Sequence, residues 1–104
     1  MRSHEWIDER SLALHEAVAA KLEARPELLG VARQNLRRWL LSGASAAWED
    51  WQRLLDRLNM PELLALLRSR DERAARLRQS SPFAGVLTTA ERQAIFEKYE
   101  SSRA

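Results

Sequence analysis

The sequence contains no cysteine, and only three glycines and three prolines interrupt its 104 residues. The absence of cysteine excludes disulfide bonds and thiolate chemistry and is typical of a reducing compartment. No glycine-rich phosphate-binding loop is present. The longest stretch without charge runs from 79 to 90, shorter than the roughly 18 apolar residues needed to span a membrane. The first ten residues mix both charge signs and lack the apolar core of a secretory signal, so we expect a cytoplasmic protein.

The sequence also lacks a catalytic or metal-binding pattern. Its two histidines, His4 and His15, are eleven positions apart, whereas histidine ligands on a helix usually lie four apart or join a cluster of carboxylates. Acidic residues are plentiful, but most fall on expected helix surfaces near arginines, and their spacing does not define a pair for acid–base catalysis. We therefore expect no catalytic residue, no metal and no other cofactor, and a function that depends on the protein surface.

Arginine dominates the charged residues that are present. Seventeen Lys and Arg face fifteen Asp and Glu, and fifteen of the cations are arginine, which gives a net charge of +2 and a pI of about 9.7. A pI above about 9 is a common sign of nucleic-acid binding, but this sign has weight only where the positive charge is clustered.

Hydrophobic periodicity predicts an all-α fold, a compact bundle of five to six short helices. The first helix is expected from Ser3 or Asp8 to about Ala24, because the proline that follows disfavours helix in the residue before it. Pro26 is expected to open the second helix, and Gly43 to end it as a left-handed cap.

Side chains that accept hydrogen bonds from free backbone N–H groups mark the later helix starts. Ser45 is a good N-cap for a third helix, and a proline opens a fourth over 61–68. The sequence at 69–72 is a capping-box pattern, which favours a separate fifth helix over about 70–79, although one continuous helix is the alternative. A second capping box at 88–91 starts the last helix.

These elements divide one domain, residues 1–104, into three parts. A helical bundle core is expected over 1–79, and an extended Ser-Ser-Pro-Phe-Ala-Gly segment over 80–88 serves as a linker or arm. A C-terminal helix follows over 89–100.

The extended segment has two interpretations. Phe83, Val86 and Leu87 either fold back onto the bundle or form an arm that docks into another protein, and an aromatic anchor is typical of binding hot spots. Apolar side chains of the last helix would extend the same surface.

The other candidate surface is the arginine-rich stretch 68–78, which holds five arginines and two acids. It is either a solvated, salt-bridged face, or a surface for a protein partner, or the recognition helix of a helix-turn-helix whose first helix is 61–68. The two acids disfavour contact with phosphates.

The expected partner-binding residues, from both surfaces, are Pro82, Phe83, Val86, Leu87, Phe96, Tyr99, Arg70, Arg73, Arg76 and Arg78.

Two stretches, 10–40 and 76–87, resemble small helical bacterial proteins that are encoded in toxin–antitoxin operons. The run Ser-Ser-Pro-Phe-Ala-Gly-Val-Leu at 80–87 is the more specific of the two. The resemblance implies a non-enzymatic antitoxin that binds and neutralises a toxin encoded nearby. The alternatives are a DNA-binding transcriptional regulator that uses the helix at 68–78, and a homodimeric structural subunit.

Overall fold

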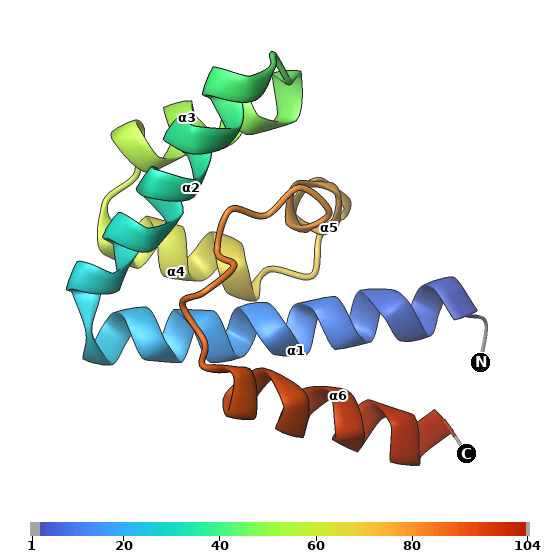
Figure 1. The fold of residues 1–104 in the computed structure, drawn as a ribbon. Coiled ribbons are helices and arrows are strands. Elements are labelled where there is room, and N and C mark those ends of the chain that lie inside the picture. Colours follow the sequence, from blue (N-terminus) through green and yellow to red (C-terminus); the bar gives the residue numbers. More distant parts are fainter. Residues whose placement is uncertain (1–2, 104) are drawn as a thin grey trace.

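The computed structural model describes residues 3–103, and side chains over 8–100, so the side chain of His4 lies outside the described residues. The described chain is all-helical and contains no strand, which confirms the predicted fold class. None of the described helices is both long enough and apolar enough to cross a lipid bilayer. The elements are α1 (Ser3–Ala24), a 3-10 turn η1 (Pro26–Leu28), α2 (Leu29–Ser42), α3 (Ala46–Arg57), α4 (Met60–Arg68), α5 (Glu72–Arg78) and α6 (Thr89–Arg103) (Figure 1).

Side-chain caps set several of the helix starts as the sequence predicts. The Ser45 hydroxyl accepts a hydrogen bond from the Trp48 N–H at 3.3 Å, which caps α3. Before α6, the Thr88 hydroxyl accepts from the Glu91 N–H at 3.1 Å, while the Glu91 carboxylate accepts from the Thr88 N–H at 2.8 Å. This reciprocal capping box satisfies two backbone donors that have no partner within the helix.

Three predicted boundaries differ from the structure. Pro26 opens a 3-10 turn, and α2 itself begins only at Leu29. Gly43 has φ 172°, an extended conformation that any residue adopts, so it is not a left-handed cap. At the start of α5, Asp71 takes the N-cap position, and its carboxylate accepts from the Ala74 N–H at 2.7 Å. Ser69 instead accepts from the Asp71 N–H at 3.2 Å and shapes the turn before the helix. Because Asp71 caps two residues later than expected, α5 is only seven residues long.

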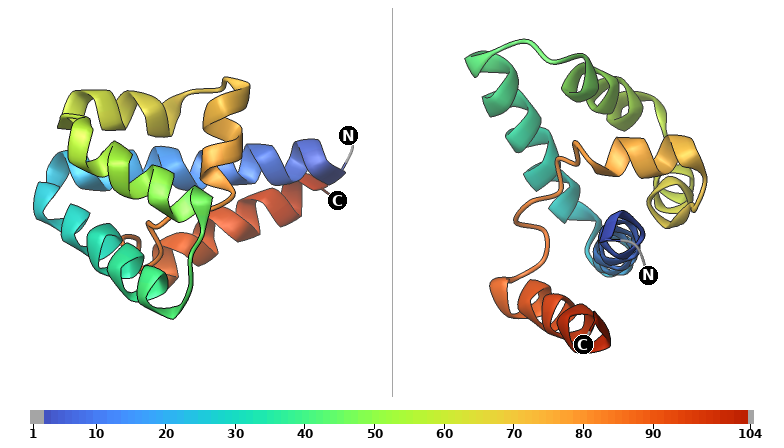
Figure 2. Two further views of the ribbon diagram at one scale, coloured as in Figure 1. Left: turned by 90° about the horizontal axis from the view of Figure 1, so that it is seen from above. Right: turned by 90° about the vertical axis from the view of Figure 1, so that its right-hand side faces the viewer.

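Helix α1 is the centre of the arrangement. It packs against α4 and α5 on one side, and α6 runs antiparallel to it on the side away from α2 and α3 (Figures 1 and 2). Helices α2 and α3 form a hairpin, in which the rings of Trp39 and Trp48 lie 5.4 Å apart. The main core combines α1, α2, α3 and α4 with part of the chain between α5 and α6.

The 79–88 segment, which connects α5 to α6, is part of that core. Pro82, Phe83 and Val86 are all buried, and Phe83 is only 4% exposed. The Phe83 ring meets Trp51 of α3 edge-on at 5.4 Å and His15 of α1 edge-on at 6.4 Å. Of the two interpretations of this segment, folding back onto the bundle is therefore correct, and an apolar arm free to reach a partner is wrong.

Polar contacts fix the path of the 79–88 segment. The buried Asn35 amide of α2 donates to the carbonyls of Pro82 and Ala84, each at 2.8 Å, and its oxygen accepts from Arg38 at 2.8 Å. Both N–H donors of the Asn35 amide therefore bond to backbone carbonyls of the 79–88 segment. Gly85 has φ +94°, a backbone conformation that side chains disfavour, and it completes the turn.

Candidate protein-binding groove

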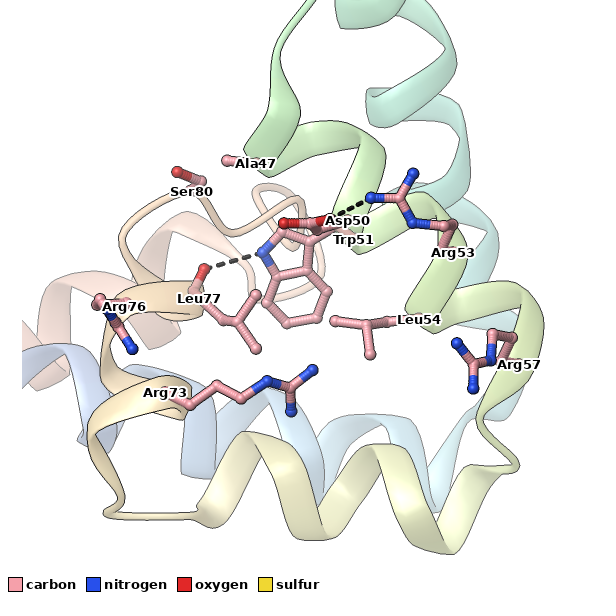
Figure 3. A pocket seen from close by; sticks show the side chains of 10 residues that line it. All are labelled: Ala47, Asp50, Trp51, Arg53, Leu54, Arg57, Arg73, Arg76, Leu77 and Ser80. Atoms are coloured by element: carbon pink, nitrogen blue, oxygen red, sulfur yellow. Dashed lines mark hydrogen bonds and ion pairs between the residues drawn. The ribbon is translucent and has the colours of Figure 1, made fainter.

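A groove lies between α3 and α5, and we name it the arginine groove (Figure 3). Its volume is about 490 Å³. It is lined by Ala47, Asp50, Trp51, Arg53, Leu54, Arg57, Arg73, Arg76, Leu77 and Ser80.

Two pairs of arginines, one from each helix, face this groove. Arg53 and Arg57 are four residues apart on α3, and Arg73 and Arg76 are three apart on α5, so each pair shares one helix face. In Figure 3 the Arg73 side chain reaches into the middle of the groove, while Arg76 and Arg57 stand near its ends. The groove therefore gathers positive charge from parts of the chain that are about twenty residues apart in sequence.

Most of this charge is not neutralised by the protein itself. Asp50 forms an ion pair with Arg53, and it is the one acidic residue in the lining. Within the described residues, Arg57, Arg73 and Arg76 form no ion pair. Four arginines and one aspartate give the lining a formal charge of +3.

The floor of the groove is apolar and fixed in position. It contains Leu54 and Leu77 beside Trp51, whose side chain is 1% exposed. The Trp51 indole N–H donates to the Leu77 carbonyl at 2.8 Å, which ties α3 directly to α5 (Figure 3). This partly buried hydrogen bond therefore helps to fix the distance between the two arginine pairs.

The four arginines expected to act together, Arg70, Arg73, Arg76 and Arg78, are divided by the structure, and Arg70 lies in the turn before α5. Arg73 and Arg76 line the groove. Arg70 forms an ion pair with Glu9 of α1 at 3.1 Å. Arg78 is buried, 7% exposed, and donates to the Ser69 carbonyl at 2.6 Å. The helical rotation of 100° per residue places residues 73 and 76 on one side of α5 and residue 78 on another. Arg70 is separated from them for a different reason, because α5 begins only at Glu72.

The apolar residues expected to bind a partner are also divided. Pro82, Phe83 and Val86 are buried and out of reach, and Leu87 is half-buried against the core. Phe96 and Tyr99 of α6 are half-buried, and Phe96 has the guanidinium groups of Arg10 and Arg92 each 4.8 Å from its ring centre. The structure does not join these residues into one surface with the arginine groove.

Arg53 and Arg57 were not predicted as site residues from the sequence. Both belong to α3, where they alternate with acids and do not form a run of positive charge. Their four-residue spacing beside the apolar positions Leu54 and Leu58 was the available signal. It became informative only when α5 was placed beside α3.

A smaller hollow of about 250 Å³ lies between α1, the 79–88 segment and α6, with His15 in its lining. His15 is buried, and its Nδ1 is 2.7 Å from the Ser11 carbonyl oxygen. Burial lowers the pKa of His15, the bond to Ser11 opposes that shift, and nearby Arg78 adds to it. Its contacts are those of a core histidine, and the described residues contain no cluster of three or more potential metal ligands.

Comparisons of the chain with models of protein families, with curated proteins and with solved structures give no match.

Proposed function

We propose that this protein is a non-enzymatic protein-binding module, an antitoxin that acts in the cytoplasm and neutralises a toxin encoded nearby. The arginine groove, and not the 79–88 segment, is the contact surface in this proposal. The antitoxin role rests on the resemblance carried by 10–40 and 76–87. The binding role rests on one observation, which is that three arginines without ion pairs to the described residues surround an apolar floor.

This combination of charge and apolar surface favours a protein partner. Arginine pairs with carboxylates through two parallel hydrogen bonds, and such pairs are stronger than bonds between neutral groups. Leu54 and Leu77 offer apolar area that a partner can bury, which is the main source of affinity in protein interfaces.

DNA binding through α5 is the competing function, and it is favoured by the arginine cluster alone. A helix that reads the major groove has to project from the protein surface. In this protein α5 has seven residues, and its two exposed arginines, Arg73 and Arg76, line a groove shared with α3. The structure therefore favours a protein partner over a duplex.

The test is co-expression with the product of the adjacent open reading frame. We expect the neighbour to stop growth when it is expressed alone, and to be silenced and retained by this chain when both are expressed. Arg73→Glu should abolish both rescue and retention, because it reverses the charge in the middle of the groove. Arg37→Glu is the matched control, since Arg37 is exposed on α2 and outside the groove.

Growth that is indifferent to the neighbour, with nothing retained, would overturn the antitoxin proposal. Retention that survives Arg73→Glu but is lost in an α6 variant would move the contact surface away from the groove.

A further inference from the structure

This inference rests on the proposed function, in which part of a partner protein binds in the arginine groove. The shape of the groove indicates which kind of secondary structure that part of the partner has. Beyond Leu54, Arg57 and Arg73 the groove continues into a second hollow, which those three residues also line. The second hollow adds Leu58, Glu62 and Leu66 to the lining. The combined surface follows α3 from Ala47 to Leu58, about 16 Å at a rise of about 1.5 Å per residue, or three helical turns.

The walls of the combined surface are helices along most of this length. Helices α3, α4 and α5 use their main-chain groups internally, and no strand edge exists in the described part of the chain. An extended peptide that binds by adding a strand needs such an edge. An occupant that is itself a helix satisfies its own backbone and presents only side chains to the groove.

The side chains of the lining determine what such a helix has to carry. Leu54 and Leu77, continued by Leu58 and Leu66, form an apolar strip that suits leucine-like residues at helical positions i, i+3 or i+4, and i+7. Arg73 lies next to Leu54 and Leu77 in the middle of the groove, and Arg76 and Arg57 lie near its ends, so carboxylates spaced along the same helix would lie opposite them.

We propose that the arginine groove binds an acidic amphipathic helix of about three turns from the partner protein. Its apolar stripe packs on the strip of leucines, and its flanking carboxylates pair with Arg57, Arg73 and Arg76. Glu62 in the lining disfavours a carboxylate or a phosphate placed beside it, which restricts the register of the bound helix, whereas Asp50 is paired with Arg53.

The experiment uses the full chain and four fluorescent probes in an anisotropy titration. The first probe is a 15-residue peptide with leucines on one helical face and glutamates on its flanks. The second has the same composition with the leucines spread over all faces, and the third replaces each glutamate by lysine. The fourth is a 15-base-pair DNA duplex.

We expect the amphipathic acidic peptide to bind at least tenfold more tightly than each other probe, and to gain helical circular dichroism on binding. Arg73→Glu should weaken it more than tenfold, and Arg37→Glu less than twofold. Leu54→Gln should weaken binding of this peptide severalfold. Because this substitution leaves the net charge unchanged, it tests the contribution of the apolar floor separately from that of the arginines.

Equal binding of the two acidic peptides would reduce the groove to an electrostatic surface and overturn the inference. So would tighter binding of the duplex that is lost in Arg73→Glu, because the groove would then serve nucleic acid. If the neighbouring protein is retained through Arg73 while the amphipathic peptide fails to bind, the inference that the groove binds a helix is wrong and the antitoxin proposal stands. If the peptide binds and no toxin is neutralised, the antitoxin proposal fails alone.

Discussion

The 79–88 segment and helix α6 are neighbours in sequence and were expected to form one partner-binding surface, but the fold treats them differently. The segment places Phe83 and Val86 in the core and is held by the buried Asn35 amide. Helix α6 packs mainly on α1, keeps its apolar residues half-exposed or exposed, and is held by charged groups. Apolar content does not separate these two regions. What separates them is whether helices surround the residues on several sides or on one.

The contacts of α6 show this difference in detail. The Lys21 ammonium of α1 lies 2.7 Å from both carboxylate oxygens of Glu91. Arg10 from α1 and Arg92 from α6 each lie over the Phe96 ring. Such contacts at a surface are weakened by salt, whereas the contacts of Phe83 in the core are not.

Phe83→Ala should have the largest effect on stability. Removing a buried aromatic ring costs about 3–5 kcal/mol, because the surrounding helices relax only in part around the cavity. Urea unfolding followed by circular dichroism measures the change in free energy of unfolding. Leu41→Ala is the control, since Leu41 is 85% exposed and its loss should change stability by less than about 0.5 kcal/mol. If Phe83→Ala is too unstable to measure, Phe83→Leu keeps the site apolar and is compared with Leu41→Ala instead.

Asn35→Ala should come next. It leaves the buried Pro82 carbonyl and the partly exposed Ala84 carbonyl without their donor, and a buried carbonyl without a partner costs about 1–3 kcal/mol. Gln34→Ala, at the exposed neighbouring position, should be close to neutral in the same urea experiment. Equal effects of the two substitutions would show that the hydrogen bonds do not hold the segment.

A smaller effect should come from His15, which contacts the Phe83 ring of the 79–88 segment. We expect it to make the free energy of unfolding depend on pH. Burial lowers the pKa of His15 below 6.5, so the unfolded chain binds a proton more readily than the folded one. The contribution of neutral His15 to the free energy of unfolding is fully present above pH 6.5. It is lost as the pH falls from 6.5 through the lowered pKa that His15 has in the folded protein. Urea midpoints between pH 7.5 and 5 should decrease, and His15→Gln should flatten that slope. A wild-type slope unchanged by His15→Gln would contradict the effect.

The smallest global effect is expected for Glu91→Gln, which should act on α6 alone. Bonds to Lys21 and to the Thr88 backbone lower the pKa of Glu91 to about 2. The stabilisation that ionised Glu91 contributes is therefore fully present above pH 4.5 and is lost as the pH falls from 4.5 towards 2. At neutral pH we expect faster amide hydrogen exchange over 89–100 in the variant and unchanged exchange in α2 and α3. Glu100→Gln, on the same helix, should leave α6 as it is. Uniform acceleration across the chain would show that α6 is an integral part of the core.

The helices were predictable because local chemistry decides where they start. Prolines and short polar side chains act within three or four residues of themselves, and Ser45 and Thr88 cap α3 and α6 as expected. The start of α5 was wrong because Ser69 and Asp71 both have capping side chains. The sequence pattern gave no means to rank them.

The candidate site was less predictable, because it depends on which helices meet. In the sequence, positive charge is concentrated in the stretch 68–78. Half of the arginines that line the groove belong instead to α3, which has no such concentration. The fate of Phe83 likewise depended on a gap between α1, α2 and α3 that no local pattern describes. Tertiary contacts of this kind override local signals.

The burial of Phe83 and Val86 also has a consequence for the order of events during synthesis. Core residues such as Val18 and Leu22 emerge early, but their cluster is completed by residues in the last fifth of the chain. Until that part leaves the ribosome, the helices made first have an unfilled apolar surface, which is the condition in which chains aggregate or recruit chaperones. Translation that stops before residue 83 therefore yields a chain with most of its helices and no closed core.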